Sequence, residues 1–156
     1  MRIHLLRHAD AENFATTDSA RALTEKGRAQ ALQVAAYLQR IRQPLDVILT
    51  SPYVRAAQTA QPIADQYASA AFKEERRLKS GMLLPAALEV IQEYADTQDL
   101  LLVGHEPDLG FVASSLLSGD RSLNVEFGKA SLLTLTLHHT QPTTAVLQSF
   151  LRIDQM

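Results

Sequence analysis

The run Leu-Leu-Arg-His-Ala-Asp at residues 5–10 decides the fold, because an apolar stretch beginning almost at the first residue ends abruptly in a charged pair. Residues 2–7 are apolar enough to predict a buried strand, whereas Arg7 and His8 would be costly to bury without partners. In open α/β sheets, ligands bind beyond the carboxyl ends of the strands, which is where these two side chains would lie. We therefore take the end of this strand as the candidate active site.

The composition is that of an ordinary globular protein, with 46% hydrophobic and 21% charged residues. The 156 residues fit a single domain spanning 1–156. A formal net charge of −2 provides no basic field, so neither nucleic acid nor an acidic membrane is an expected partner. The absence of cysteine excludes disulfides, thiolate metal sites and cysteine nucleophiles. The start is charged too soon for a signal peptide and no apolar run reaches ~20 residues, so we expect a cytoplasmic protein.

Helix signals follow apolar runs along the first half of the chain. Residues 9–22 lack periodicity and read as a loop, after which Thr24 is a good N-cap for an amphipathic helix over 25–42. A short apolar strand is predicted over residues 46–50.

A second helix is predicted to begin directly after that strand. Ser51 suits the N-cap and Pro52 the first helical position, which places Arg55 in the opening turn beside free N–H groups. Because Pro62 lies too deep to be a cap, we expect a kink or break near Gln58.

The second half continues the alternation and then changes pattern. The alternation predicts an edge strand over 71–77, a helix over 85–94, a central strand over 100–103 and a helix over 107–118. The changed pattern then predicts an alternating antiparallel strand over 133–138 with one face covered, a turn at 140–144 and a final strand over 145–153. Gly119 is the expected stop of the helix that Pro107 opens. The sequence therefore predicts a three-layer α/β/α sandwich with a mostly parallel central sheet and an antiparallel strand near the C-terminus.

Four side chains stand at the predicted carboxyl ends of strands or at the adjoining helix start: Arg7, His8, Arg55 and His105. Two guanidiniums and two imidazoles suit a phosphoryl group, because arginine binds its oxygens bidentately and stays charged. The arginines should also lower the pKa of His8 by like-charge repulsion, which keeps a lone pair free for attack on phosphorus. His105 would donate to the phosphoryl oxygens.

Other histidines and carboxylates have simpler interpretations. His4 is expected to be a satisfied core side chain, and in a strand it lies about 13 Å from His8, too far to share a metal ion. We therefore expect no metal site and no cofactor. A magnesium-dependent aspartyl-phosphate site at Asp10 and Glu12 would leave Arg7-His8 unexplained. His138 and His139 sit by a turn and should face solvent.

Four stretches, in order, resemble the histidine phosphatase superfamily, also called phosphoglycerate-mutase-like. They are Leu6-Arg7-His8-Ala9, Leu23-Thr24-Glu25-Lys26-Gly27-Arg28-x-Gln30-Ala31, Ser51-Pro52-x-x-Arg55-Ala56-x-Gln58-Thr59-Ala60 and Val103-Gly104-His105-Glu106-Pro107. The short length makes the chain most similar to the SixA-like phosphohistidine phosphatases. The resemblance implies that His8 is the phosphorylated nucleophile and that Arg7, Arg55 and His105 bind the phosphoryl group.

The chain differs from larger relatives in the residue available as general acid. Those relatives carry a glutamate after the third strand. Here that region offers only Glu74 and Glu75. Glu106 resembles the position where acid phosphatases of the superfamily keep an aspartate donor, and the alternative is that it only caps the helix at Pro107. An imidazole leaves phosphorus more readily than an alkoxide, so a phosphoramidate needs less help from an acid.

These residues lead to the hypothesis of a metal-independent phosphatase acting on phosphohistidine of a protein. The alternatives are a small-molecule phosphomonoesterase of the same superfamily and a non-catalytic phosphate-binding module. The expected partner is accordingly a phosphorylated protein or a small phosphorylated substrate.

Overall fold

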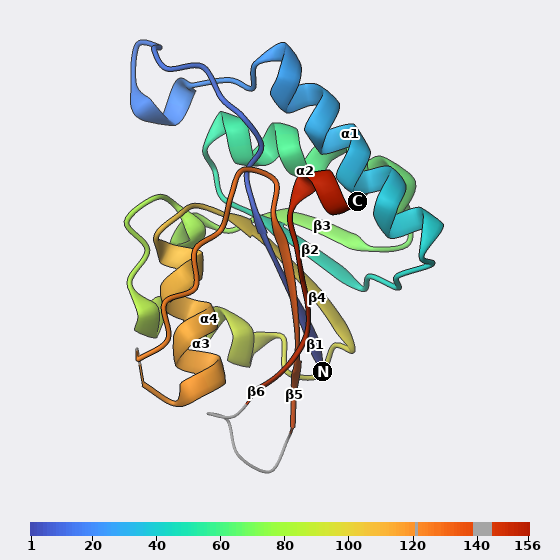
Figure 1. Cartoon of the computed structure of the whole chain (residues 1–156), viewed down its shortest axis with the longest axis vertical. Coiled ribbons are helices and arrows are strands. Elements are labelled where there is room, and N and C mark those ends of the chain that lie inside the picture. Colours follow the sequence, from blue (N-terminus) through green and yellow to red (C-terminus); the bar gives the residue numbers. More distant parts are fainter. Residues whose placement is uncertain (121, 139–144) are drawn as a thin grey trace.

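The computed structural model describes residues 1–120, 122–138 and 145–156 and contains a six-stranded sheet in the order β3-β2-β4-β1-β5-β6 (Figure 1). The strands are β1 (Arg2–Arg7), β2 (Val47–Thr50), β3 (Ala71–Glu74), β4 (Asp99–Gly104), β5 (Leu132–Leu137) and β6 (Ala145–Leu151). The α-helices are α1 (Glu25–Arg40), α2 (Val54–Gln66), α3 (Leu84–Glu93) and α4 (Asp108–Ser118). In the described ranges, no helix combines the length and apolar character needed to cross a membrane.

The helices cover both faces of the sheet, with α1 and α2 on one side and α3 and α4 on the other (Figure 1). Successive side chains of a strand point to opposite faces, so each central strand serves both cores. In β1, for example, Leu5 packs in the core with α3 and α4, while Leu6 packs in the core with α1 and α2. The predicted three-layer sandwich is confirmed.

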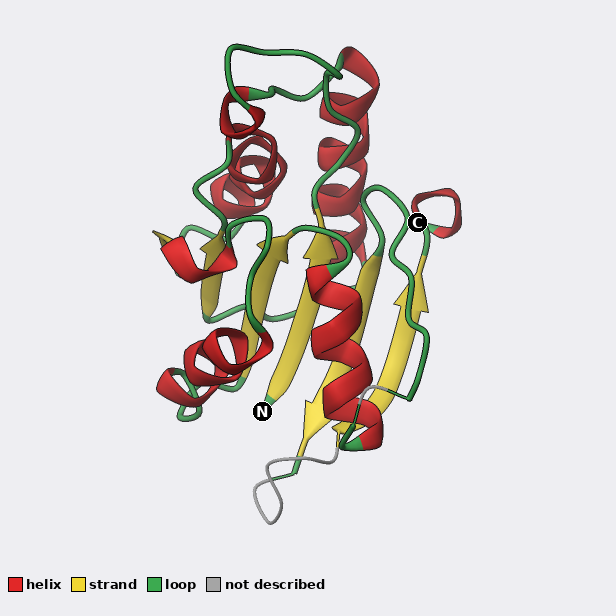
Figure 2. Ribbon diagram, turned by 90° about the vertical axis from the view of Figure 1, so that its left-hand side faces the viewer, coloured by secondary structure: helices red, strands yellow, loops and turns green. Residues whose placement is uncertain are grey.

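Four strands of the sheet, β1 to β4, run parallel, and β5 pairs antiparallel with both β1 and β6. Most of the strand arrows accordingly point toward the same end of the sheet (Figure 2). The predicted mixture of a mostly parallel sheet with an antiparallel strand near the C-terminus is also confirmed. Parallel pairing places the carboxyl ends of β1, β2 and β4 side by side, which is what positions the candidate site.

Most predicted elements lie within a few residues of the observed ones. Thr24 caps α1 through a hydrogen bond from the Gly27 N–H to its Oγ1 at 2.9 Å. Gly119 ends α4 with a φ of 74°, a left-handed conformation that glycine adopts without cost. The loop predicted over 9–22 contains one short 3₁₀ turn, Asp18–Ala20.

The start of the second helix was predicted two residues too early. Helix α2 begins at Val54 with Tyr53 as its N-cap, so Ser51 does not cap it. Ser51 instead lies in the candidate site, where its Oγ contacts His105 Nε2 at 2.8 Å. Of the kink or break predicted near Gln58, the break is wrong, because α2 continues through Pro62 to Gln66.

Strand β5 is more buried than its alternating sequence predicts. Thr134, on the face expected to meet solvent, is buried and its Oγ1 lies 3.0 Å from His4 Nδ1. The other ring nitrogen of His4 lies 3.2 Å from Asp99 Oδ1, so His4 is the satisfied core histidine that was expected. His138 is exposed as predicted, whereas His139 and the predicted turn at 140–144 lie outside the described residues.

Candidate active site

The residues predicted to form the site come together because β1 and β4 are neighbours in the sheet. Arg7 is in register with Gly104, and the His8 N–H donates to the Gly104 carbonyl at 3.0 Å. His105 therefore follows β4 directly beside His8, with the two ring centroids 5.2 Å apart. Helix α2 is tied to the same point, since the Ala9 N–H donates to Thr59 Oγ1 at 3.0 Å.

The ring of His8 is oriented by two hydrogen bonds. Nδ1 lies 2.7 Å from the carbonyl oxygen of Ala9, and because a carbonyl only accepts, Nδ1 carries the hydrogen. Nε2 is then the nitrogen without a hydrogen, and its lone pair accepts from Arg55 Nε at 3.2 Å. The backbone thus fixes which nitrogen of His8 is available to an electrophile.

Arg55 donates two further N–H groups to the loop between β1 and α1. Its Nη1 donates to the Asp18 carbonyl at 2.6 Å, and its Nη2 donates to Asp18 Oδ2 at 3.0 Å. The side chain of Asp18 is 54% exposed, while that of Arg55 is 5% exposed. Asp18 thus occupies both terminal nitrogens of a buried guanidinium, one through its backbone carbonyl and one through its exposed carboxylate, and these nitrogens are the ones suited to bind a phosphoryl group.

His105 is held by Ser51 at the end of β2. Ser51 Oγ accepts the Tyr53 N–H at 3.3 Å and lies 2.8 Å from His105 Nε2. We assign the hydrogen of the second contact to the serine, the tautomer that leaves Nε2 as the acceptor. His105 Nδ1 is then a donor, and it is buried without a hydrogen-bond partner.

Arg7 supplies a second buried donor of this kind. Its Nη1 donates to the Phe127 carbonyl, while its Nε is buried without a partner. Buried polar atoms in folded proteins nearly always have partners, so two unpartnered donors beside His8 indicate a site for an acceptor-rich ligand. A phosphoryl group has this chemistry.

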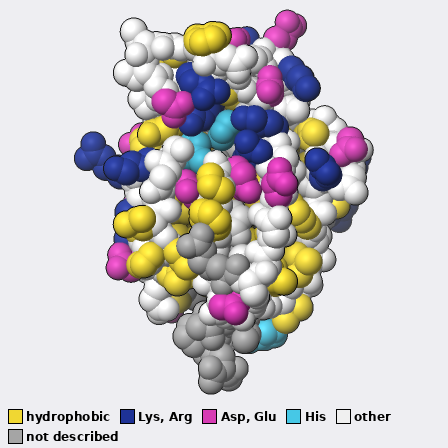
Figure 3. Space-filling view, turned by 60° about the vertical axis from the view of Figure 1, so that its left-hand side comes forward, with side chains coloured by type: hydrophobic (Ala, Val, Ile, Leu, Met, Phe, Trp, Pro, Cys, Tyr) yellow, Lys and Arg dark blue, Asp and Glu magenta, His cyan; other side chains and the backbone are white. Residues whose placement is uncertain are grey.

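The surface of the molecule shows imidazole side chains between lysine and arginine side chains, with acidic side chains on the neighbouring surface (Figure 3).

Burial and positive charge keep both imidazoles neutral. The pKa of His8 is lowered to about 2, first by burial, then by the charge of Lys129, with smaller effects from His105 and Arg55. The pKa of His105 is lowered to about 3 by burial and the charge of Arg55. The predicted direction for His8 was therefore right, but burial outweighs the arginine repulsion that we expected to cause it.

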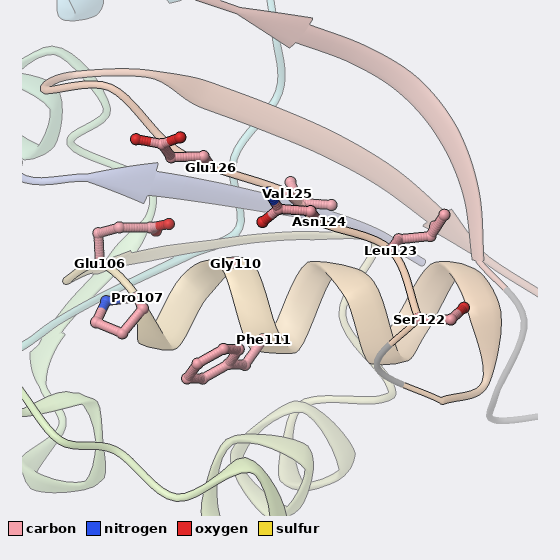
Figure 4. Close-up of a pocket in the computed structure, with 9 residues that line it drawn as sticks. All are labelled: Glu106, Pro107, Gly110, Phe111, Ser122, Leu123, Asn124, Val125 and Glu126. Atoms are coloured by element: carbon pink, nitrogen blue, oxygen red, sulfur yellow. The ribbon is translucent and has the colours of Figure 1, made fainter.

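Glu106 lies at the start of α4, against the loop at residues 122–126, and lines a cavity of about 450 Å³ there (Figure 4). Burial raises the pKa of its carboxyl, while hydrogen bonds from the backbone of Phe127 and Gly110 and the charge of Arg7 act in the opposite direction. Its Oε2 is buried without a partner. The contact with Gly110 fits a helix cap, and the unpartnered oxygen with a raised pKa fits a proton donor, so one side chain suits both predicted roles.

Three residues near His8 and His105 were not singled out for these positions from the sequence. Asp18 comes from a loop without periodicity, and Lys129 from a connection before β5 without a recognisable motif. The one usable signal concerned Ser51, because it follows a buried strand whose carboxyl end adjoins that of β4. In the described part of the chain, no three histidine, aspartate or glutamate side chains gather as metal ligands.

The fold and the grouping of histidine and arginine side chains at the end of the sheet suit a phosphatase. Comparisons with known proteins identify the class. The family model of the histidine phosphatase superfamily (branch 1) matches residues 3–80, and the chain belongs to this superfamily of phosphatases. Within it, the chain is similar to the phosphohistidine phosphatase SixA of Escherichia coli strain K12, with 26% identity over 138 residues, covering 77% of this chain and 76% of SixA.

Two further proteins are similar to this chain. An uncharacterized protein of a Picosynechococcus species is 33% identical over 140 residues, covering 86% of this chain and 84% of its own. A solved structure of the protein histidine phosphatase SixA complexed with tungstate superposes with a TM-score of 0.88 at 21% identity, covering 99% of this chain and 98% of that one. At that identity the superposition shows the shared fold.

Proposed function

We propose that this phosphatase works through a covalent phosphohistidine formed at His8 Nε2. The observation that carries the proposal is the orientation of the His8 ring, with Nδ1 committed to the Ala9 carbonyl and the Nε2 lone pair facing Arg55. A neutral imidazole beside fixed positive charge is a competent nucleophile toward phosphorus. The lowered pKa of His8, about 2, keeps this nitrogen unprotonated at any working pH.

In the first step, the Nε2–P bond forms as the bond between phosphorus and the leaving group breaks. The leaving atom takes its proton from Glu106, whose raised pKa favours the protonated form. In the second step, water attacks phosphorus, the P–Nε2 bond breaks with its electron pair returning to Nε2, and one proton of the water passes to Glu106. The products are inorganic phosphate and neutral His8. Arg55, Arg7 Nε and His105 Nδ1 donate to the phosphoryl oxygens in both steps.

We further propose that the substrate is phosphohistidine on a protein. The similarity to SixA phosphohistidine phosphatases supports this substrate. The acid group supports it as well, because the carboxyl that we assign as the proton donor, Glu106, is held partly by hydrogen bonds from the backbone of Phe127 and Gly110. After β3, Glu75 is engaged by Arg77 at 2.8 Å and is unsuited to donate. A phosphoramidate tolerates a weaker acid than an ester does.

In this mechanism Arg55, Arg7 and His105 stabilise the negative charge of the phosphoryl oxygens. We therefore propose that the reaction needs no metal ion. A small-molecule phosphomonoesterase is the alternative that the experiment must distinguish from a phosphohistidine phosphatase. It differs in the leaving group, which would be an alkoxide rather than an imidazole.

The test compares hydrolysis of a histidine-phosphorylated protein with that of sugar phosphates, nucleotides and an aryl phosphate, in the presence of a chelator. We expect the highest kcat/KM on phosphohistidine and no turnover by His8→Ala. Slower hydrolysis of phosphohistidine than of the alkyl phosphates would overturn the substrate assignment. Loss of all activity on adding chelator would overturn metal independence, and a wild-type protein inactive on every substrate would leave a phosphate-binding module.

A further inference from the structure

A second polar cavity adjoins the candidate active site on the side of β5 and β6. Its volume is about 310 Å³, and its polar lining residues are Gln30, Lys129, Ser131, Arg152 and Asp154. The backbone joins it to the end of β1, since the Ala130 N–H donates to the His8 carbonyl at 3.3 Å and the Arg7 N–H donates to the Ser131 carbonyl at 3.1 Å. None of these lining side chains has a step in the mechanism above.

Ser131 is the feature of this cavity that calls for a ligand. The residue is 1% exposed, and its hydroxyl oxygen is buried without a hydrogen-bond partner. A buried hydroxyl without a partner is uncommon in folded proteins, because the group loses its hydrogen bonds to water and gains none in return. A ligand with an acceptor oxygen would supply the missing partner.

Gly128 leaves room for that ligand between the hydroxyl and a guanidinium. A Cβ atom at this position would lie 3.2 Å from Ser131 Oγ, 3.7 Å from Arg152 Nη2 and 3.9 Å from Arg152 Nε. The two donors therefore flank the same space above the glycine. Any side chain at residue 128 would fill it.

The charge of the cavity suits a singly charged anion. Lys129 and Arg152 provide two positive charges and Asp154 one negative charge, which leaves a formal +1. Gln30 adds a donor, because its amide oxygen already accepts the Asp10 N–H at 2.9 Å and its NH₂ group remains available. The charge of Lys129 also acts on both His8 and His105, so this lysine links the cavity to the phosphoryl site.

We propose that this cavity is a subsite for a carboxylate of the substrate protein, namely an aspartate or glutamate side chain near the phosphohistidine. The inference rests on the proposed function for the identity of the substrate. A guanidinium with a neighbouring hydroxyl binds the two oxygens of a carboxylate, and the formal charge of +1 is neutralised by it. The subsite would select among phosphohistidine proteins by their acidic flanking residues.

The kinetic test uses two phosphohistidine peptides that differ only in carrying glutamate or glutamine at the positions flanking the phosphohistidine. The wild-type protein should show a KM about tenfold lower for the glutamate peptide, as expected for one charge-assisted contact. In Arg152→Gln and Ser131→Ala the preference should fall below about twofold, with kcat on the glutamine peptide unchanged. Ser131→Ala removes a hydroxyl that has no partner, so we expect it to fold normally.

Arg42→Gln is the matched control, because it removes one exposed positive charge between α1 and β2, at the opposite end of the sheet. It should keep the wild-type preference. An equal preference in wild type and Arg152→Gln would overturn the subsite, as would turnover of both peptides with the same KM by the wild type.

A binding measurement separates the subsite from the proposed function. With the phosphoryl site filled by tungstate, acetate is titrated while the amide resonances of residues 128 and 131 are followed by NMR. Saturable shifts should appear in wild type and Arg42→Gln and disappear in Arg152→Gln and Gly128→Ala. If neither peptide is hydrolysed but these shifts appear, the substrate proposal fails and the anion subsite stands. The absence of saturable shifts overturns the subsite whatever the activity.

Discussion

Two carboxylates, those of Asp18 and Glu106, are expected to have opposite effects on a substrate at the proposed phosphoryl site. Asp18 occupies two N–H groups of Arg55 from the solvent side, while Glu106 keeps an unpartnered oxygen in a half-buried setting where its pKa is raised. We infer that the first carboxylate competes with the substrate for the Arg55 guanidinium, and we propose that the second gives the leaving group its proton. Single substitutions distinguish these effects.

Replacing Asp18 with asparagine should tighten phosphate binding. The substitution removes the negative charge that holds Arg55 Nη2, so the inhibition constant of inorganic phosphate should fall about two- to fivefold, the scale of one partly exposed ion pair. Asp65→Asn is the control, because Asp65 is an exposed carboxylate on α2 that contacts Gln61 rather than the site. An inhibition constant that is unchanged or higher in Asp18→Asn would show that Asp18 does not compete with phosphate.

Replacing Glu106 with glutamine should affect substrates unequally. The kcat for an alkyl phosphate should fall about 100-fold, because the alkoxide loses its proton donor, while the kcat for phosphohistidine should fall less than about tenfold. Steady-state kinetics with both substrates measures the difference. Glu126→Gln removes a carboxylate from the same cavity and serves as the control. Equal losses on the two substrates would leave Glu106 with only its capping role.

The raised pKa of Glu106 also sets the pH dependence for ester substrates. The acid must be protonated, so kcat/KM for an alkyl phosphate should decline as pH rises through the pKa of Glu106. His8 adds no acid limb near neutrality, because its pKa of about 2 keeps it neutral there.

Among the secondary-structure elements, α1 illustrates how a cap connects folding to the site. Thr24 Oγ1 accepts the Gly27 N–H at 2.9 Å and donates to Asp10 Oδ2 at 2.8 Å, so the helix start is joined to the loop that follows His8. Gly27 allows this close approach, because a Cβ there would lie 1.9 Å from the Asp10 carbonyl oxygen.

Thr24→Ala should lower the free energy of unfolding by about 1 kcal/mol, the usual cost of losing an N-cap. Urea denaturation measures this change. Thr24→Ser keeps the hydroxyl and should retain most of the stability. If the alanine variant is as stable as the wild type, or the serine variant is equally destabilised, the cap does not contribute as described.

The elements also show what could be predicted from sequence. The apolar runs of β1 and β4 and the polar ends after them were sufficient to predict the strands, their burial and the meeting of His8 with His105. The start of α2 was misplaced because Ser51 and Pro52 fit a helix start locally, whereas Ser51 is held by His105 from another strand. Contacts of that kind, like Asp18 on Arg55, depend on how distant segments pack and leave no periodic signal.

At the scale of the whole molecule, three buried histidines couple stability to pH. The pKa values of His4, His8 and His105 are all lowered, with burial as the largest cause. Below about pH 6.5 the unfolded chain binds protons at these histidines that the folded chain does not. Their stabilising contribution is therefore present above that pH and is lost as the pH falls.

The free energy of unfolding should accordingly decrease between pH 7 and pH 5, with up to about 1.4 kcal/mol per pH unit from each histidine. Glu106 and Asp108 partly offset this decrease, because their raised pKa values favour the folded state as pH falls toward 4.5. Urea melts at several pH values measure the slope. His8→Gln should reduce it, and an unchanged slope in that variant would contradict the lowered pKa of His8.

The two cores share the strands of one sheet, and on that ground we propose that residues 1–156 form a single domain. The sheet order brings the carboxyl ends of β1, β2 and β4 together, and these ends carry Arg7, Ser51 and His105. The site is thus a product of the topology rather than of any one motif, which is why the fold and the central residues of the site were predictable together.

The central claim is that His8 accepts the phosphoryl group, and trapping the phosphoenzyme tests it most directly. The protein is mixed with a ³²P-labelled substrate in the presence of chelator, quenched during turnover, and mapped by mass spectrometry. We predict label on His8 that is stable in base and lost in acid, and that is absent from His8→Ala. Turnover without any labelled protein, or label on another residue, would contradict the account.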